Sequence, residues 1–185
     1  AAVRDVAIAG GAIAAVAAAL PVSHAAKEVT AAGLYVTPGL PGTSFATVVN
    51  STTGLELAVA RTMTWDNGHG GHSASASGAL AGKWYLAEGA QGYFDTYIVV
   101  GNPGATAGIV TITFLVEGGT PIVKQYNISP TQRLTVFAGD IVGLPGTSFS
   151  TVVEATVPVI AERAMYFGVF KAWDGGTAAS AAGAT

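Results

Sequence analysis

The composition of the chain excludes several classes of function. The chain has 185 residues and a net charge of −3; half of its residues are hydrophobic and only 10% are charged. The 8 Lys and Arg residues do not cluster, so neither nucleic acid nor an anionic membrane surface is expected as a partner. Cysteine is absent, which excludes disulfides, thiolate metal sites and a cysteine nucleophile.

The apolar stretch of residues 6–20 has two interpretations. Arg4 before it and small residues after it outline a secretory signal, which would make the stretch a hydrophobic helix, either a signal remnant or the stem of a pilin-like subunit. Internal alignment instead places Gly10-Gly11 on Gly118-Gly119, which predicts two strands joined by a glycine turn. We favour the strands, although alanine is a poor strand former. No membrane-spanning segment is expected.

A repeated motif indicates that the chain contains one structural unit twice. Residues 40–49 read LPGTSFATVV, and residues 144–153 read LPGTSFSTVV. Recurrence at the spacing of a domain predicts a tandem array. We therefore expect two domains, residues 1–82 and residues 83–185.

The first copy contains only the later part of this unit. Its expected strands cover residues 28–30, 40–49 and 57–65. Arg61 and Met63 align with Arg163 and Met165, and an arginine that recurs on a strand among apolar neighbours favours a structural ion pair, or a stem packed over the sheet edge, over a ligand contact. No segment of the first copy matches residues 83–102.

The second copy reads as a series of short strands separated by turns. The pattern is typical of a β-sandwich, because the segments are rich in Val, Ile, Thr, Tyr and Phe. In residues 108–116, Val110, Ile112, Phe114 and Val116 share one face, which is expected to point inward. The expected strands are residues 83–88, 96–100, 108–116, 122–128, 133–138, 149–154 and 157–166.

Together these patterns predict an all-β chain of two tandem immunoglobulin-like antiparallel β-sandwich domains, the first lacking its opening strands. The missing strands would leave unpaired backbone groups and an uncovered apolar groove. Either a neighbouring subunit donates a strand, as in pilus donor-strand complementation, or the chain is an excerpt of a longer array. The residues expected to mediate assembly are Val3, Val6, Ile8, Ile13, Val16, Leu20, Trp84, Tyr85 and Leu86.

Several short motifs resemble those of a known repeat family. WYLAEG at residues 84–89, FDTY at 94–97 and NP at 102–103 are followed by ERAMY at 162–166, and GGHSAS stands at 70–75 in the first copy. This set resembles a tandem immunoglobulin-like repeat of large bacterial surface and secreted proteins. The resemblance implies an extracellular β-sandwich and no catalytic residues. The second copy has Thr177 where GGHxS has histidine, which argues against an essential histidine.

The candidate metal ligands are few. Asp66, His69 and His72 follow one another at three-residue spacings and could hold zinc or another transition metal. Three glycines lie among them and the second copy lacks both histidines, so a solvated loop is the favoured interpretation. Calcium held by aspartate and backbone carbonyls between domains stays an alternative. No cofactor is expected.

Catalytic candidates are equally sparse. Glu88 and Asp95 could form the carboxylate pair of a glycosidase, but nothing in the sequence fixes their separation. Ser44 and Ser148 lie in the repeated PGTSF turn, where a hydroxyl is expected to cap backbone groups, and no His and Asp partners recur with them. We therefore expect no enzymatic activity.

The sequence thus predicts a structural subunit of an extracellular bacterial filament or surface layer. The partners expected for this subunit are further copies of the same chain, joined head to tail into a homopolymer. A first alternative is a carbohydrate-binding or spacer module of a larger secreted protein, with Trp65, Tyr85, Tyr93 or Phe94 as an aromatic platform. In that case exposed coplanar rings are expected. The second alternative is the pilin-like subunit with an N-terminal helix.

Overall fold

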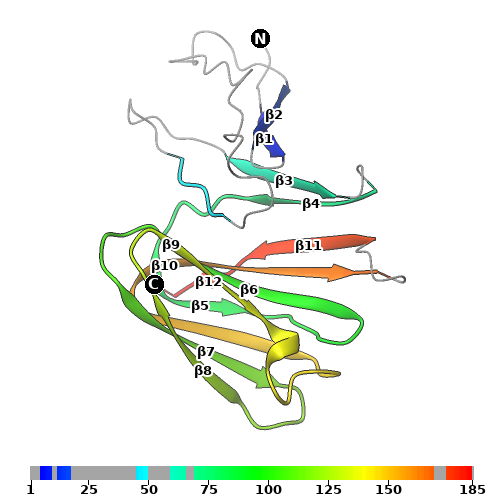
Figure 1. Cartoon of the computed structure of the whole chain (residues 1–185), viewed down its shortest axis with the longest axis vertical. Coiled ribbons are helices and arrows are strands. Elements are labelled where there is room, and N and C mark those ends of the chain that lie inside the picture. Colours follow the sequence, from blue (N-terminus) through cyan, green and yellow to red (C-terminus); the bar gives the residue numbers. More distant parts are fainter. Residues whose placement is uncertain are drawn as a thin grey trace. The chain divides into compact units, whose positions relative to one another are not determined.

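The computed structural model describes residues 5–9, 12–17, 45–49, 59–65, 69–168 and 174–184. The chain divides into two compact units, Ala1–Ala76 and Ser77–Thr185, called unit 1 and unit 2 below. Apart from one short 3₁₀ turn, η2 (Ala138–Asp140), the regular elements of the described residues are all β-strands (Figure 1). The all-β prediction is therefore confirmed.

Unit 1 contains two hairpins joined into one sheet. Strands β1 (Asp5–Ala9) and β2 (Ala12–Ala17) are antiparallel, as are β3 (Ala60–Trp65) and β4 (Gly70–Ser75). Strand β1 also pairs with β3, in parallel, so the order is β2-β1-β3-β4. The start of the chain thus forms the predicted strands, and the alternative of a hydrophobic helix is wrong for these residues. Each strand contains two β-branched residues, which favour strands despite the many alanines.

Unit 2 contains the strands of the second copy. They are β5 (Ala81–Leu86), β6 (Phe94–Asn102), β7 (Gly108–Val116), β8 (Ile122–Ile128), β9 (Gln132–Phe137), β10 (Phe149–Phe167), β11 (Gly175–Ser180) and β12 (Ala182–Gly183). The predicted bounds of β7 and β8 are confirmed to the residue. The prediction of separate strands at 149–154 and 157–166 is wrong, because both belong to β10.

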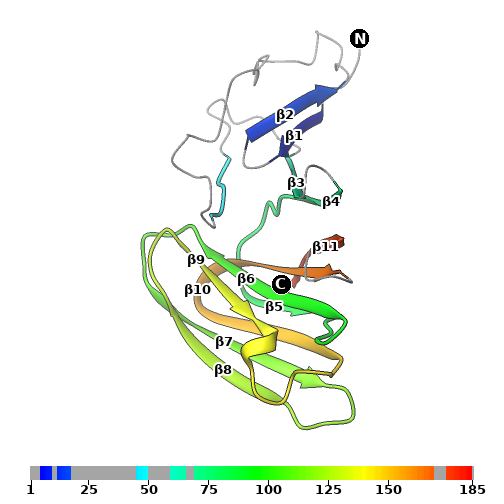
Figure 2. The ribbon, with the colours of Figure 1, turned by 45° about the vertical axis from the view of Figure 1, so that its right-hand side comes forward.

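Strand β10 takes part in both layers of the sandwich. Its first half pairs with β5 and β7, and its second half pairs with β6 and β11. Pro158 lies where the pairing changes, which suits a residue that cannot donate to a ladder. One layer has the order β12-β5-β10-β7-β8 and the other β11-β10-β6-β9; Figure 2 shows β10 curving between them.

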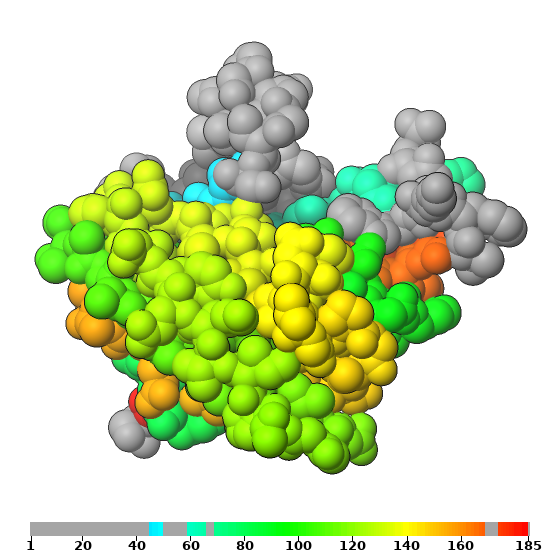
Figure 3. Space-filling model, turned by 60° about the horizontal axis from the view of Figure 1, so that its bottom comes forward, coloured from blue at the N-terminus to red at the C-terminus, as the bar shows by residue number. Residues whose placement is uncertain are grey.

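The core of unit 2 lies between these two layers. Val110, Ile112 and Phe114 of β7 are fully buried, as predicted from their alternation. Ile98 and Val100 of β6 face them from the other layer. Outside this core, β8 and β9 (yellow-green) and η2 (yellow) lie on the face that Figure 3 presents.

One hairpin is built in the same register in both units. In unit 1, Arg61, Met63 and Trp65 pair with Ala74, His72 and Gly70. In unit 2, Arg163, Met165 and Phe167 pair with Ala179, Thr177 and Gly175. A Cβ atom on Gly70 would collide with the Trp65 ring, and one on Gly175 with the Phe167 ring. The aligned sequences therefore form aligned structures, down to the glycine beneath each aromatic side chain.

The repeated motif, by contrast, has two different structures. Residues 149–153 open β10, where Phe149, Thr151 and Val153 are buried. Residues 45–49 of the first copy form no strand, and Val48 and Val49 are exposed. The prediction of a strand over residues 40–49 is therefore wrong for 45–49. Sequence preference is insufficient there, because the strands that flank residues 149–153 have no counterpart beside residues 45–49 in the described part of the chain.

The domain prediction is only partly open to comparison with the structure. The expected strand at residues 28–30 and the beginnings of those at 40–49 and 57–65 lie outside the described residues. The expected boundary between residues 82 and 83 falls within β5, whereas the two compact units divide after Ala76. An incomplete immunoglobulin-like domain over residues 1–82, followed by a complete one, stays a prediction.

Candidate functional site

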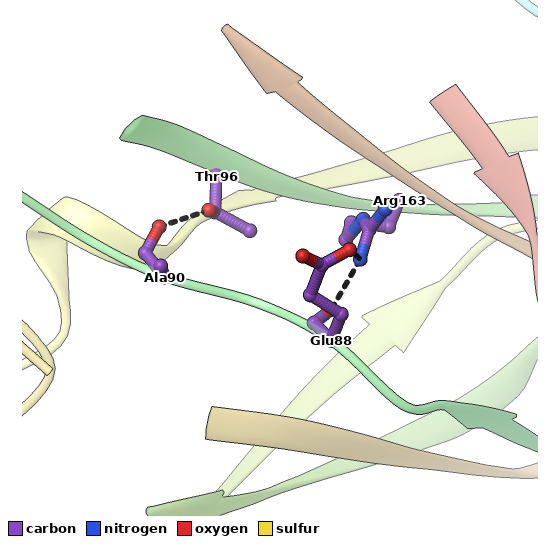
Figure 4. Close-up of polar contacts among 4 residues, drawn as sticks. All are labelled: Glu88, Ala90, Thr96 and Arg163. Atoms are coloured by element: carbon purple, nitrogen blue, oxygen red, sulfur yellow. Dashed lines mark hydrogen bonds and ion pairs between the residues drawn. The ribbon is translucent and has the colours of Figure 1, made fainter. Parts of the chain in front are cut away.

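A buried polar arrangement in unit 2 surrounds Arg163. This residue points between the two layers, opposite Ile98 of β6, and its side chain is only 8% exposed. Its Nη1 donates to the backbone oxygen of Glu88 at 2.7 Å and to the Glu88 carboxylate at 2.9 Å (Figure 4). A buried guanidinium requires such partners, because an uncompensated charge in the interior is costly. The prediction that this arginine forms a structural ion pair is confirmed.

The segment that leads from β5 to β6 is fixed by further hydrogen bonds. The Thr96 hydroxyl donates to the Ala90 carbonyl (Figure 4). The Thr96 amide donates to Gln91 Oε1 at 3.0 Å. Thr96 and Gln91 are both buried. These contacts hold the connection over the inner face of β6 and β10. Gln91 and Thr96 were not predicted from the sequence, although both lie in or beside the WYLAEG and FDTY motifs.

The two carboxylates considered for glycoside hydrolysis have different partners. Glu88 is bound by Arg163, while its side chain is 73% exposed. Asp95 accepts a hydrogen bond of 3.4 Å from Gln91 Nε2. Neither carboxyl shows the apolar burial that equips a general acid. Their arrangement therefore fits a role in positioning the β5–β6 connection.

The candidate metal ligands are not brought together among the described residues. Asp66 lies outside them, His69 is exposed, and His72 is buried on β4 with its ring 5.9 Å from that of Trp65. Burial, reinforced by the nearby Arg61 cation, lowers the pKa of His72 below its ordinary value of 6.5. No group of three potential metal ligands occurs in the described part of the chain. Calcium between the units stays a prediction.

The PGTSF turn is stabilised by a residue other than the one expected. Ser44 lies outside the described residues. Ser148 is exposed, and it forms an isolated β-bridge with Ala90. The neighbouring Thr147 hydroxyl donates to the Leu144 carbonyl at 2.7 Å, and Gly146 has a positive φ of 79°. The capping role is therefore played by threonine. Glycine serves the left-handed turn position.

Three of the residues expected to mediate assembly lie in β5. Trp84 is 2% exposed and donates from Nε1 to the Val159 carbonyl at 2.9 Å, and Leu86 is also buried. The prediction that Trp84 and Leu86 mediate assembly is therefore wrong, because the sandwich of unit 2 already buries both side chains. Tyr85 points outward beside Lys83, whose Nζ lies 5.6 Å from the ring centroid.

The remaining assembly candidates lie at the start of the chain. Val6 pairs with Val16, and Ile8 with Ile13, across the β1–β2 hairpin. Val3 and Leu20 lie outside the described residues. Their proposed role in assembly stays a prediction.

Aromatic rings gather where β6 begins and β10 ends. Tyr93 is 71% exposed, and its ring stacks on that of Phe167 at 6.1 Å with an interplanar angle of 13°. Phe94 meets both rings edge-on. Tyr93 and Phe94 were predicted from the sequence as part of an aromatic platform, whereas Phe167 was not included in it. Trp65, the platform candidate in unit 1, is only partly exposed and lies over Gly70.

An apolar strip crosses the outer face of the β12-β5-β10-β7-β8 layer. Tyr85, Val152, Thr113 and Val123 lie in one row by strand register, and Leu115 lies next to this row on β7. Tyr85, Leu115 and Val123 are each more than two-fifths exposed. Clustered exposed apolar side chains are typical of interaction surfaces.

Among the described residues, no helix is long and apolar enough to cross a membrane.

The comparisons with known proteins show the fold but no family. The sequence matches no protein-family model, and no curated protein matches it significantly. A solved structure described as the crystal structure of Thermotoga maritima 1070 has a TM-score of 0.52 and 21% identity, over 56% of this chain and 95% of that one. The Anabaena sensory rhodopsin transducer is 19% identical, with a TM-score of 0.39, over 44% of this chain and 93% of that one. The first of these similarities is to a β-rich fold, in agreement with the sandwich described above.

Proposed function

We propose that the chain is a structural, non-catalytic subunit of an extracellular bacterial filament or surface layer. The single observation that carries this proposal is that two hairpins share the same backbone register but do not share their chemically reactive side chain. The hairpins β3–β4 and β10–β11 share their register, including the arginine, the methionine and the glycine beneath an aromatic ring. His72 of β4 corresponds to Thr177 of β11, so the histidine, which is the most reactive side chain of the first hairpin, does not recur in the second.

Surface composition also supports an assembly role. Charged residues make up 10% of the chain, and the apolar strip of Tyr85, Leu115, Val123 and Val152 lies on an outer sheet face. Burial of such surface between copies contributes roughly 25 cal/mol per Å². The resemblance to bacterial surface repeats supports the extracellular location.

Electron microscopy and analytical ultracentrifugation at neutral pH test the proposal. We expect filaments or sheets whose abundance rises with protein concentration. Val123→Lys places a charge on the exposed strip and should reduce assembly, whereas Thr120→Lys, in the exposed turn before β8, is the matched control. Monodisperse monomers at all concentrations would contradict the proposal.

A second candidate, a carbohydrate-binding module, is favoured by one observation. The exposed ring of Tyr93, which is stacked nearly parallel on that of Phe167, presents an aromatic face on which a sugar could lie. Titration with soluble oligosaccharides, followed by calorimetry, tests it. Tyr93→Ala should remove binding, while Tyr85→Ala should leave it intact; heats unaffected by Tyr93→Ala would argue against the platform.

A further inference from the structure

We propose that one end of unit 2 binds the opposite end of unit 2 in a second copy of the chain, with a tip at Val142 seated in a groove beside Ile109. This inference rests on the proposed function and names the contact that joins copies end to end. The residues of the tip and of the groove all belong to the described part of unit 2.

The tip is the turn that follows η2. Val142 is 89% exposed, the highest fraction among the large exposed hydrophobic residues of the described chain. Its neighbours Ile141 and Leu144 are buried, and the Leu144 amide donates to the Ile141 carbonyl at 3.0 Å. Gly143 supplies the positive φ of 96° in this turn. Buried residues on both sides thus hold Val142 outward, so that docking orders little additional chain.

The groove lies where β7 begins and β8 ends. It has a volume of about 390 Å³ and is open to solvent. Its lining combines two isoleucines with three polar residues, namely Ile109, Ile128, Asn127, Ser129 and Thr156. Ile109 is 45% exposed, so apolar surface is accessible in the groove. A valine side chain that enters the groove removes this surface from water together with its own.

Unpaired polar groups on the tip and in the groove complement each other. In the described part of the chain, no hydrogen bond is made by the Asn127 carboxamide or by the backbone N–H and C=O of Val142. A carboxamide carries both donors and an acceptor, so Asn127 can pair with both groups of one peptide backbone at once. The groove therefore offers apolar contact to the valine side chain and hydrogen bonds to its main chain.

The tip and the groove lie at opposite ends of unit 2. A Cβ atom on Gly143 would touch Ile122, the first residue of β8, whereas the groove is lined by Ile128, the last. These two isoleucines are separated by about 20 Å of strand. Figure 1 shows η2 (yellow) and the start of β7 at the corresponding ends of the sandwich. A contact between unlike ends leaves one tip and one groove free on every pair, so it can repeat along a filament.

Complementation between two variants tests the contact. Val142→Asp alters the tip and leaves the groove intact, whereas Ile109→Asp alters the groove and leaves the tip intact. Each variant alone should associate at least about tenfold more weakly than the wild type in analytical ultracentrifugation, because the contact would bury a carboxylate. An equal mixture of the two should recover dimers, since one intact tip still meets one intact groove. Thr120→Asp, in the exposed turn before β8, is the matched control and should associate like the wild type.

A cross-link tests the same contact directly, because the chain contains no cysteine of its own. Val142→Cys places a thiol on the tip, and Ser129→Cys places one in the groove. Mixed in the presence of oxidised glutathione, the two variants should form a mixed disulfide much faster than either forms a disulfide with itself, since the bond requires Cα atoms within about 7 Å. Thr120→Cys replaces Val142→Cys in the control mixture, where cross-linking should be slow.

Two results would overturn the inference: no recovery of dimers in the mixture of aspartate variants, or a mixed disulfide that forms no faster than in the control. Its failure is distinguishable from failure of the proposed function. If the chain forms filaments without this cross-link, the tip and the groove are wrong while the structural function stands. If the cross-link forms but the wild-type chain gives neither filaments nor sheets, the contact stands and the filament proposal fails.

Discussion

Identical residues at the two positions of the repeated motif allow a matched mutational comparison. Val153 is fully buried on β10, opposite Trp84 on β5 and Ile112 on β7. Val49, its counterpart, is 47% exposed in a segment without strand structure. Each is changed to alanine, so the same atoms are removed from the same local sequence and only the surroundings differ.

The expected magnitudes follow from burial. Val153→Ala removes two buried carbon groups, worth about 1.6 kcal/mol by transfer at about 0.8 kcal/mol each, and the cavity left behind raises the loss to about 2–3 kcal/mol. Val49→Ala should change the free energy of unfolding by less than about 0.5 kcal/mol, since exposed substitutions rarely do more. Typical stabilities of about 5–15 kcal/mol make the first loss easily measured.

Urea unfolding, followed by circular dichroism and by tryptophan fluorescence, measures both variants. Trp84, one of the 3 tryptophans of the chain, lies opposite Val153, so its contribution to the fluorescence reports on unit 2. The reasoning is refuted if Val49→Ala costs as much as Val153→Ala, which would mean that residues 45–49 are packed in a core. A loss below about 0.5 kcal/mol for Val153→Ala would equally contradict the placement of β10.

Three further predictions follow from local contacts. Arg163→Met should change the free energy of unfolding by less than about 1 kcal/mol, since the exposed Glu88 carboxylate returns to water. Glu88→Ala should cost about 1–3 kcal/mol, because it deprives a buried guanidinium of its counter-ion. The urea midpoints of the two variants measure the difference, and equal losses would contradict the structural role given to this ion pair. Gly175→Val should lower the midpoint of thermal unfolding by several degrees, because its side chain would meet the Phe167 ring, while Gly101→Ala, with open space around the new methyl group, should have little effect. The lowered pKa of His72 means that the unfolded state binds a proton more readily than the folded state, so the stability of unit 1 should fall as pH drops through about 6.5. Midpoints of thermal unfolding between about pH 7.5 and about pH 5 should show this loss in the wild type and not in His72→Thr. A loss of equal size in both proteins would exclude His72 as its cause.

Strands β7 and β8 were predictable because each combines a clear pattern with a clear turn, whereas β11 and β12 were not predicted. Alternating Val110, Ile112 and Phe114 identified β7, and the Gly118-Gly119 turn identified the hairpin to β8. The continuity of β10 was not predictable, because Pro158 normally marks the end of a strand. Here the proline occupies the point at which neighbouring strands change, and only the tertiary arrangement reveals such a point.

Residue type alone gave a mixed result for the candidate site. The recurrence of Arg61 and Arg163 correctly indicated a structural ion pair for Arg163, since a buried guanidinium must be compensated. The same approach placed Trp84 on an assembly surface, although it lies in the core. Large aromatic residues suit both environments, and strand register decides between them. Register depends on neighbouring strands that lie far away in sequence.

The passage of one strand through both layers has a mechanical consequence. Because β10 is covalently continuous from its pairing with β5 and β7 to its pairing with β6 and β11, the two layers cannot come apart unless β10 leaves its partners in one of them. Tension applied to one layer is transmitted along this shared backbone to the other. The strand thus links the two layers by covalent bonds, in addition to the apolar contacts of the core between them.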